Sequence, residues 1–468
     1  MISPQPTHAP ASISPAPSAP AWVWVAGAVA LGAAVGLLVG RGTLAPLTVA
    51  LAVGLIALAA LSFRRLEFGL IALLFTLPLD TYGRLIETPV TVTVFHVVLL
   101  ICLAAWVRKI VTEPGWVRFS WLDAAAAALV GAGLWSLPHS LAPSTTLVSV
   151  IRLAFLWAFA ALYASGIRDS RTLRRVLGWL VGTGVLLSLM GIAQFYLPDL
   201  GIGWIRDVLR AGGAVSFSRI GAFFYDPNYL AGLLSAIVAV SLSLLVHAHR
   251  RRAALLWGGA AALTGLVLVL TYSRGGWVGA AAGILVAVVT APSRRRAWLV
   301  SGLVVVAIAI AIAAPDLIVS RVQSITNVET DVSVATRYYM NVSMGEMIAD
   351  RPVFGTGLGA FDQTYPYFRR PGTSLDIIKP HQVPLAFIAE TGIAGVLAEL
   401  TLLGGLVALY WRRRPDGWGA LEAAVLVGTV TLLVGTLFEY YLYFEYVWLF
   451  LGLSVVATRL ARTQKEDD

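Results

Sequence analysis

The sequence is short of cysteine and of charged residues, and each shortage excludes something. Cys102 is the only cysteine among the 468 residues, so the chain can form no internal disulfide. Charged residues make up 13% of the chain against 58% hydrophobic residues, and the mean hydropathy is +0.80. A soluble globular domain carries about twice that share of charge. The composition therefore predicts a polytopic membrane protein.

The patterns of several common sites are also missing. His96 and His139 have no acidic or cysteine partner at the spacing of metal ligands, and no serine lies in a Gly-x-Ser-x-Gly turn. The glycines at 355, 357 and 359 follow no strand of a βαβ unit, so they predict a flexible turn and not a dinucleotide site. We expect no metal ion and no cofactor.

What the sequence has in abundance is apolar segments long enough to cross a bilayer, roughly 17 to 25 residues each. They predict an all-α fold, a polytopic transmembrane bundle of about 12 to 14 helices. The first 20 residues, rich in Pro, Ala and Ser, predict a disordered tail. The apolar segments lie near 21–40, 43–62, 66–79, 90–107, 121–137, 146–165, 174–197, 228–247, 253–272, 276–291, 297–314, 383–411, 418–438 and 440–460.

Basic residues gather in every second connection between these segments. By the positive-inside rule, this alternation places both termini in the cytoplasm. It also explains the net charge of +9 as membrane orientation, and not as nucleic-acid binding. The clusters are Arg64-Arg65, Arg108-Lys109, 168–175, 249–252, 293–296, 411–414 and 459–462.

The same alternation divides the chain into four parts. A cytoplasmic tail over 1–20 is followed by transmembrane helices over 21–314. A large, outward-facing loop over 315–382 precedes the last transmembrane helices and a short cytoplasmic tail over 383–468. The charge of this loop is mixed, and long loops are translocated largely regardless of their charge. We expect functional groups to concentrate in the outward connections.

Three arginines lie on the outward side, where basic residues do not help orientation. They are Arg219 in "SFSRIGAFF", Arg274 in "TYSRGGWVG" and Arg337 in "VATRYYMNVSMGEMIAD". Together with His381, they suggest an anionic ligand, because a guanidinium is a permanent, planar fork suited to phosphate. Each arginine alone is also explained by contact with lipid headgroups. By contrast, Asp226 needs only a structural role, as the cap of the following helix with Pro227 in its first turn.

The long loop contains a predicted amphipathic helix. Arg337, Met340, Met344 and Met347 are spaced by three, four and three residues and so share one face. The helix is predicted to lie along the membrane surface and to end before Pro352.

Four fragments in this order resemble the O-antigen ligase and O-antigen polymerase (Wzy-type) superfamily: "RIGAFFYDPNYLAG", "YSRGGWVG", "TRYYMNVSMGEMIADRPVFGTGLGAF" and "PHQVPLAFIAETGIAGVLAEL". The resemblance covers roughly residues 200–400. It implies a metal-independent, integral-membrane glycosyltransferase of the cell inner membrane that uses a glycan carried on undecaprenyl diphosphate and works on the periplasmic face. Relatives typically have His-Asn where this chain has His381-Gln382.

The resemblance also suggests roles for the candidate residues. Arg219, Arg274 and Arg337 would bind the donor diphosphate and stabilise its charge as the sugar departs. His381 would take the proton of the acceptor hydroxyl, in a single displacement that inverts the anomeric centre. Glu390 would support the site, more as a partner of an arginine than as a second base.

Several alternatives remain open on the sequence alone. Glu439 and Glu445 either orient the external arginines or are incidental acids in a belt of interfacial aromatic residues, and the belt is the favoured interpretation. The acceptor is lipid A-core or a similar group in a ligase, and the next lipid-linked repeat unit in a polymerase. A secondary transporter of an anionic solute, with Glu390 carrying protons, is an alternative of another class, although no internal repeat supports it. The oligomeric state is open.

Overall fold

The computed structural model is a helical bundle with two short β-hairpins, in agreement with the predicted all-α polytopic fold. The expected tail over 1–20 and the first expected span over 21–40 lie outside the described residues. The structure describes residues 46–80, 84–86, 92–113, 115–117, 119–197, 208–212, 215–224, 226–313, 332–370, 379–411 and 417–466.

The helices follow one another with short connections over most of the chain. The first group is α2 (Pro46–Arg64), α3 (Leu66–Thr76), α4 (Val94–Thr112), α5 (Trp121–Ser136), α6 (Pro143–Gly166) and α7 (Ser170–Tyr196), with short 3₁₀ turns at Leu77–Asp80 and Leu137–His139. The middle group is α8 (Pro227–His247), α9 (Arg251–Leu270), α10 (Arg274–Thr290) and α11 (Ser293–Ala313). The last group is α13 (Val332–Asp350), α14 (Phe361–Phe368), α15 (Val383–Thr391), α16 (Ile393–Tyr410), α17 (Ala420–Gly435) and α18 (Glu445–Glu466).

The two hairpins lie in connections between helices. Strands β1 (Arg84–Ile86) and β2 (Val92–Thr93) pair in front of α4. Strands β3 (Val208–Gly212) and β4 (Val215–Arg219) pair antiparallel in front of α8, with Val208 opposite Arg219.

Seven of the described helices are long and apolar enough to cross a membrane, and four shorter apolar helices accompany them. Most of the expected segments fall on these helices. The seven are Val94–Thr112, Trp121–His139, Pro143–Gly166, Ser170–Tyr196, Pro227–His247, Arg251–Leu270 and Ile393–Tyr410.

Helix α8 is the centre of one half of the bundle, where α9, α10 and α17 surround it. Of its 21 residues, 17 are buried. It begins as predicted, since Asp226 precedes it and accepts a hydrogen bond from the Asn228 N–H, while Pro227 is its first residue. Small residues bring its neighbours close: a Cβ at Gly283 of α10 would lie 1.9 Å from the Thr431 hydroxyl of α17.

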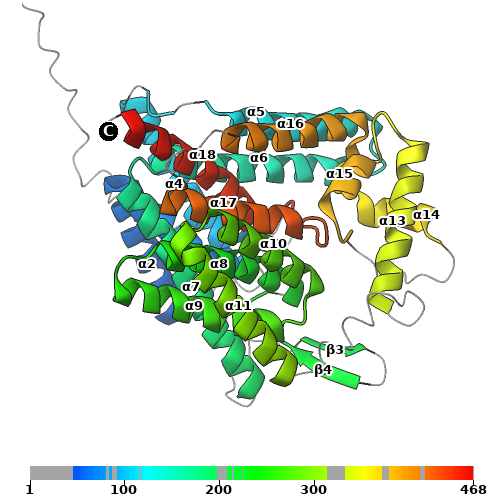
Figure 1. The fold of residues 1–468 in the computed structure, drawn as a ribbon. Helices are drawn as coiled ribbons and strands as arrows, with labels where there is room; N and C mark the ends of the chain where they lie inside the picture. The colour runs from blue at the N-terminus through cyan, green and yellow to red at the C-terminus, as the bar shows by residue number, and fades with distance from the viewer. Residues whose placement is uncertain are drawn as a thin grey trace, which may run out of the picture.

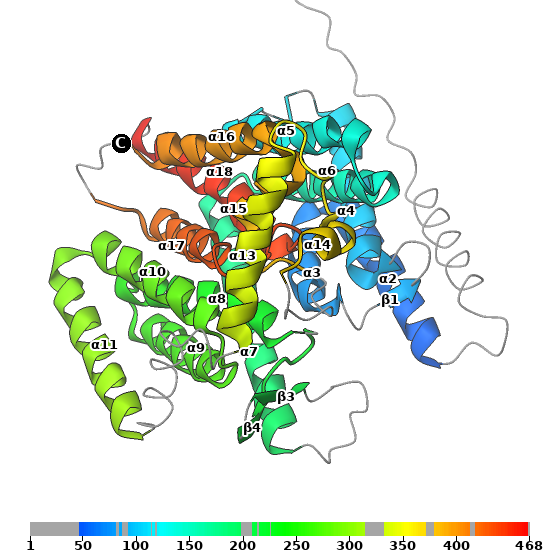
Figure 2. The same cartoon turned by 90° about the vertical axis from the view of Figure 1, so that its right-hand side faces the viewer.

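Helix α13 lies across one end of the bundle (Figures 1 and 2). Met340, Met344 and Met347 are fully buried on the face that was predicted from their spacing. The helix ends at Asp350, before Pro352, as expected. In Figure 1, α13, α14 and α15 occupy the right-hand end of the molecule, opposite the C-terminus.

The expected single span over 383–411 is broken into α15 and α16 at Gly392. Gly392 has φ of +64°, and a Cβ there would lie 2.4 Å from the Val353 carbonyl oxygen. The Ile393 N–H then donates to the Pro352 carbonyl at 2.9 Å. The chain that follows α13 therefore packs directly against the break, which only glycine permits.

The glycine turn after α13 is packed, and not flexible as predicted. Gly355, Gly357 and Gly359 all have positive φ. The Gly357 N–H donates to the Glu390 carbonyl at 2.9 Å, and the Thr356 N–H to the Ala389 carbonyl at 3.1 Å. These bonds tie the turn to the end of α15.

Candidate functional site

The predicted site residues converge on residues 436–444, which connect α17 to α18 without helical structure. We call this stretch the connecting segment. The expected spans over 418–438 and 440–460 left almost nothing between them, whereas α17 ends at Gly435 and α18 begins at Glu445. Three consecutive residues of the segment, Glu439, Tyr440 and Tyr441, each contact a different part of the site.

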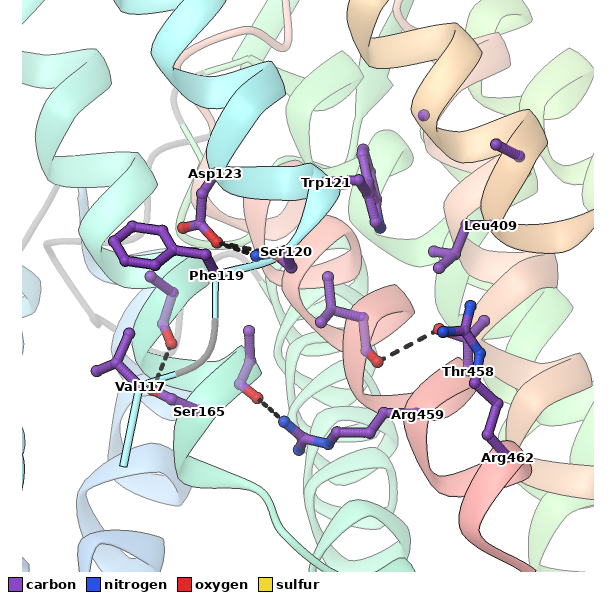
Figure 3. A pocket seen from close by; sticks show the side chains of 15 residues that line it. Val117, Phe119, Ser120, Trp121, Asp123, Ser165, Leu409, Thr458, Arg459 and Arg462 are labelled. Atoms are coloured by element: carbon purple, nitrogen blue, oxygen red, sulfur yellow. Dashed lines mark hydrogen bonds between the residues drawn. The ribbon is translucent and has the colours of Figure 1, made fainter. Parts of the chain in front are cut away.

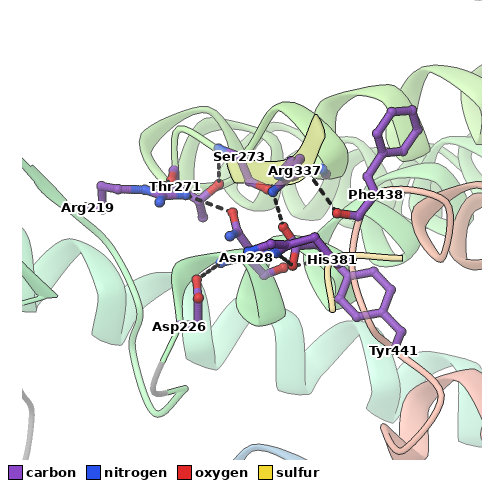
Figure 4. A network of polar contacts seen from close by, with 11 residues as sticks. Arg219, Asp226, Asn228, Thr271, Ser273, Arg337, His381, Phe438 and Tyr441 are labelled. Atoms are coloured by element: carbon purple, nitrogen blue, oxygen red, sulfur yellow. Dashed lines mark hydrogen bonds and ion pairs between the residues drawn. The ribbon is translucent and has the colours of Figure 1, made fainter. Parts of the chain in front are cut away.

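Glu439 joins Arg337 to His381. One carboxylate oxygen lies 2.5 Å from Nη2 of Arg337 and the other 3.2 Å from Nδ1 of His381 (Figure 4). Glu439 is 2% exposed, while the Arg337 and His381 side chains keep 27% and 31% of their area open. A buried acid thus holds two half-buried groups that a substrate can still reach.

Arg337 reaches the connecting segment from α13. The buried methionine face turns Arg337 toward the bundle, and its Nη1 donates to the Phe438 carbonyl at 2.9 Å. Its Nε is buried and has no hydrogen-bond partner among the described residues. The guanidinium is therefore held by two neighbouring groups of the segment in one orientation.

His381 is fixed just in front of α15. The Val383 N–H donates to the Thr436 carbonyl at 2.8 Å, which ties the start of α15 to the connecting segment. Gln382, the helix N-cap residue, donates through its amide to the Asn341 side chain of α13 at 2.7 Å. The two residues that follow His381 are thus held in place, one by α13 and the other by the connecting segment.

The surroundings of Glu439 keep it charged. Burial acts to raise its pKa, but the hydrogen bond with His381 and the positive charge of Arg337 outweigh burial and hold the pKa below its usual range. Because an ionised carboxylate only accepts, Nδ1 of His381 is assigned the proton of that bond. In the neutral ring, Nε2 is then an unprotonated acceptor, the form that a general base requires.

Arg219 lies at the end of β4 and is 9% exposed. Its Nε donates to the Thr271 carbonyl at 2.7 Å, and its Nη2 to the Asn228 side chain at 2.9 Å (Figure 4). The Tyr441 hydroxyl donates to the Asn228 carbonyl at 2.8 Å. Asn228 therefore connects Arg219 to the connecting segment.

Arg274 is the first residue of α10, directly after a tight turn. The Ser273 side chain caps the helix by accepting from the Gly276 N–H, and Tyr272 has φ of +53°. A Cβ at Gly275 would lie 2.8 Å from Cβ of Phe438, so the turn lies against the connecting segment.

Glu390 is 1% exposed, and its hydrogen bonds differ from the predicted arginine partner. Its carboxylate accepts from the Phe361 N–H at 3.2 Å and from the Tyr440 hydroxyl at 3.1 Å. Burial raises its pKa to about 7, despite hydrogen bonds with Gly359, Tyr440 and Phe361 that act to lower it. Glu390 thus links the glycine turn to the connecting segment.

Glu439 is the residue that sequence reasoning underrated. The favoured interpretation, an incidental acid in an aromatic belt, is wrong for this position. The sequence did contain an indication of this role, because burying an acid between two apolar segments costs free energy unless the acid is paired. Its partners, however, are about 58 and 102 residues away in sequence, and no periodicity reports such contacts.

Within the described ranges, no three His, Cys, Asp or Glu side chains are grouped closely enough to hold a metal ion. The groups that the site offers are a histidine, a carboxylate and guanidiniums. They suit proton transfer and the binding of an anion.

Residues 259–400 match the family model of the O-antigen ligases, so this part of the protein carries an O-antigen ligase domain. The predicted resemblance is confirmed over these residues, which make up less than a third of the chain and include Arg274, Arg337, His381 and Glu390. Arg219 and Glu439 lie outside the match and meet the others only in the fold. No curated protein matches the chain.

Proposed function

We propose that the protein transfers a glycan from undecaprenyl diphosphate to an acceptor hydroxyl on the periplasmic face of the inner membrane, as an O-antigen ligase-type glycosyltransferase. The observation that carries this proposal is the contact of Glu439 with both His381 and Arg337. It combines a base with a cation at one end of a membrane bundle whose matched part is an O-antigen ligase domain.

In this proposal His381 acts as the general base. Nε2 takes the proton of the acceptor hydroxyl while the oxygen attacks the anomeric carbon, and the bond from that carbon to the diphosphate breaks. Nδ1 keeps its proton and donates it in the hydrogen bond to Glu439. The negative charge of Glu439 then stabilises the imidazolium that forms. The single displacement inverts the anomeric centre.

Arg274 and Arg337 bind the diphosphate as negative charge develops on it. Arg219 is more enclosed, and its bonds to Thr271 and Asn228 support a second task for it, holding the turn that carries Arg274. Full activity of both Arg274→Ala and Arg337→Ala would remove the diphosphate contact from this mechanism.

The test uses purified protein in detergent, with lipid-linked glycan and an acceptor and without an ion gradient. We expect time-dependent glycan transfer, and in His381→Gln a loss of about 10²- to 10⁴-fold in turnover per folded molecule, the usual range for a general base. His139→Gln is the matched control, since His139 stacks on Phe354 at 3.8 Å between ring centroids, away from the connecting segment. Near-normal turnover of His381→Gln would exclude it as the base. A protein that only transports an anionic solute would convert no glycan.

The acceptor is tested in cells. We propose lipid A-core or a similar terminal acceptor, and mass spectrometry of lipid-linked glycan after deletion of the protein distinguishes it from the alternative. Accumulated long chains on the carrier are expected for a ligase. Accumulated single repeat units would identify a repeat-unit polymerase instead.

A further inference from the structure

The end of the bundle opposite the candidate site contains two hollows between helix ends. One, of about 420 Å³, lies between the start of α5 and the ends of α6, α16 and α18 (Figure 3). Arg459 extends across it from α18 and donates to the carbonyls of Ala164 and Ile167, so it caps α6. Its charged lining is mixed, because Asp123 lies there together with Arg459 and Arg462.

The second hollow, of about 470 Å³, is different because its charged lining is entirely basic among the described residues. It lies where the end of α8, the start of α11 and the start of α17 meet. We call it the basic hollow. Its lining residues are His247, His249, Pro292, Ser293, Arg294, Arg295, Trp418 and Ala420.

Two of the three arginines beside the basic hollow cap helix ends, whereas the third is exposed. Arg295 donates to the Val246 and Ala248 carbonyls, and Arg296 to the Val289 and Ala291 carbonyls, so they cap α8 and α10. Arg294 is exposed and makes no hydrogen bond or ion pair with another residue of the described ranges. Among the described arginines that line the basic hollow, Arg294 is therefore the one whose side chain has no structural contact.

Further donors surround the basic hollow. Helices α11 and α17 begin at two of the lining residues, Ser293 and Ala420. The N-cap residue of α17 is Gly419, which has no side chain to cap the helix. Helix N-termini offer backbone N–H groups and partial positive charge to anions. His247 donates through Nδ1 to the Ser243 carbonyl at 2.8 Å, while its buried Nε2 has no partner within the part of the chain that the structure describes.

The exposed face of α11 continues from the basic hollow as an apolar stripe. Trp298 lies one turn beyond Arg294 and is 79% exposed, and Val305 lies two turns further on the same face and is 65% exposed. A cation, then a tryptophan, then an aliphatic residue is the order in which side chains meet headgroups, the interface and acyl chains. This order favours a lipid over a free phosphate compound.

We propose that the basic hollow binds the phosphate of an anionic phospholipid headgroup, with Arg294 as its main ligand and the acyl chains along the exposed face of α11. This lipid is separate from the proposed glycan donor. Helix α8 runs from Asp226 beside Arg219 to His247 in the hollow, and its 21 residues span roughly 30 Å at 1.5 Å per residue. One lipid headgroup cannot occupy both ends.

Native mass spectrometry of the purified full chain, titrated with phosphatidylglycerol or phosphatidylcholine, tests the proposal. We expect tight binding of phosphatidylglycerol, weakened about tenfold or more by Arg294→Ala, because a charge-assisted contact to phosphate is lost. Arg174→Ala is the matched control: it removes the same charge from an exposed arginine of α7 outside the hollow. If both variants weaken binding equally, only the general surface charge matters and the proposal is overturned. If neither variant weakens binding, Arg294 is not a ligand and the proposal is also overturned.

A second variant separates a lipid from a free phosphate compound. Trp298→Ala should weaken phosphatidylglycerol binding several-fold and leave the binding of inorganic phosphate unchanged. If inorganic phosphate binds as tightly as the lipid and Trp298→Ala changes neither, the occupant is not a phospholipid. Both substitutions are at exposed positions, so the melting temperature should match that of the wild type and shows that each variant is folded.

Discussion

Glu439 lies in the connecting segment and Glu390 accepts a hydrogen bond from it, and both are buried, yet their surroundings move their pKa values in opposite directions. Arg337 and His381 provide Glu439 with positive charge and a donor, and its pKa is lowered. Glu390 meets only neutral donors among the described residues, and burial raises its pKa to about 7. The first residue therefore works as a charge, and the second as a hydrogen-bonding group that titrates near neutrality.

For Glu439 we predict that Glu439→Gln lowers glycan turnover per folded molecule by about 10²-fold or more and also lowers the melting temperature. The amide keeps the size of the side chain but leaves Arg337 without its counter-charge, and breaking a buried pair costs about 3–5 kcal/mol. Glu346→Gln is the control, because Glu346 lies on α13, the helix that carries Arg337, and pairs with Arg370 at the protein surface. It should change stability by less than about 1 kcal/mol. Wild-type turnover in Glu439→Gln would contradict its role.

The lowered pKa of Glu439 also sets a pH window. Its stabilising contribution is fully present above the ordinary carboxyl pKa of 4.5 and is lost only as pH falls through the lower folded value. Melting temperatures of wild type and Glu439→Gln should therefore differ by a constant amount between about pH 6 and 8, and converge in acid.

For Glu390 we predict the opposite slope. A raised carboxyl pKa contributes stability that is present below 4.5 and is lost as pH rises through about 7. The difference corresponds to roughly 3 kcal/mol at 1.36 kcal/mol per pKa unit. Glu390→Gln keeps an acceptor for Phe361 and Tyr440 and should flatten the fall of the melting temperature between pH 5 and 8. An unchanged slope would mean that another group titrates in this range.

At the scale of helices, the sequence predicted a helix start or a buried helix face correctly where neighbouring residues alone determine it. The Asp226-Pro227 cap starts α8, and the methionine spacing identifies the buried face of α13. The break at Gly392 and the irregular connecting segment were not predicted. Both lie in apolar sequence, where hydropathy does not distinguish a helix from a buried turn, and both depend on backbone contacts with distant residues such as Pro352 and Val383.

The break between α15 and α16 leads to a prediction about glycine. Gly392→Ala should lower the melting temperature strongly and reduce activity, because its Cβ would collide with the Val353 carbonyl and the residue has positive φ. Gly404→Ala in α16 is the control, since no atom lies within 4 Å of the added Cβ. It should be neutral or slightly stabilising. Similar losses in both variants would show that general packing of α16, and not the break, is responsible.

At the scale of the whole molecule, the bundle separates two kinds of arginine. Those of the candidate site lie at the end covered by α13, and those that cap helices lie at the other end. The sequence predicted this separation from the alternation of basic clusters, and family resemblance directed attention to His381 and three arginines. Neither the sequence pattern nor the resemblance predicted how His381 and the arginines are connected, because the hydrogen bonds through Asn228, Glu439 and Tyr440 join separate helices.

Labelling tests the orientation proposed from this alternation. A cysteine at Tyr367, which is 82% exposed on α14, should react with an impermeant maleimide in intact spheroplasts. A cysteine at Arg174 should react only after permeabilisation. The native Cys102 is fully buried and should stay unlabelled in both. Labelling of the Arg174 position alone in intact cells would reverse the orientation and move His381 to the cytoplasm.

The three consecutive contacts of the connecting segment have a consequence for how such a protein can change over evolution. Glu439, Tyr440 and Tyr441 reach α13, α15 and α8 respectively, each through a single side chain. Replacing one of them disturbs one contact, but inserting or deleting one residue just before them shifts all three out of register together. Chain length should therefore be more strictly constrained here than residue identity, even though irregular segments between helices usually tolerate insertions and deletions.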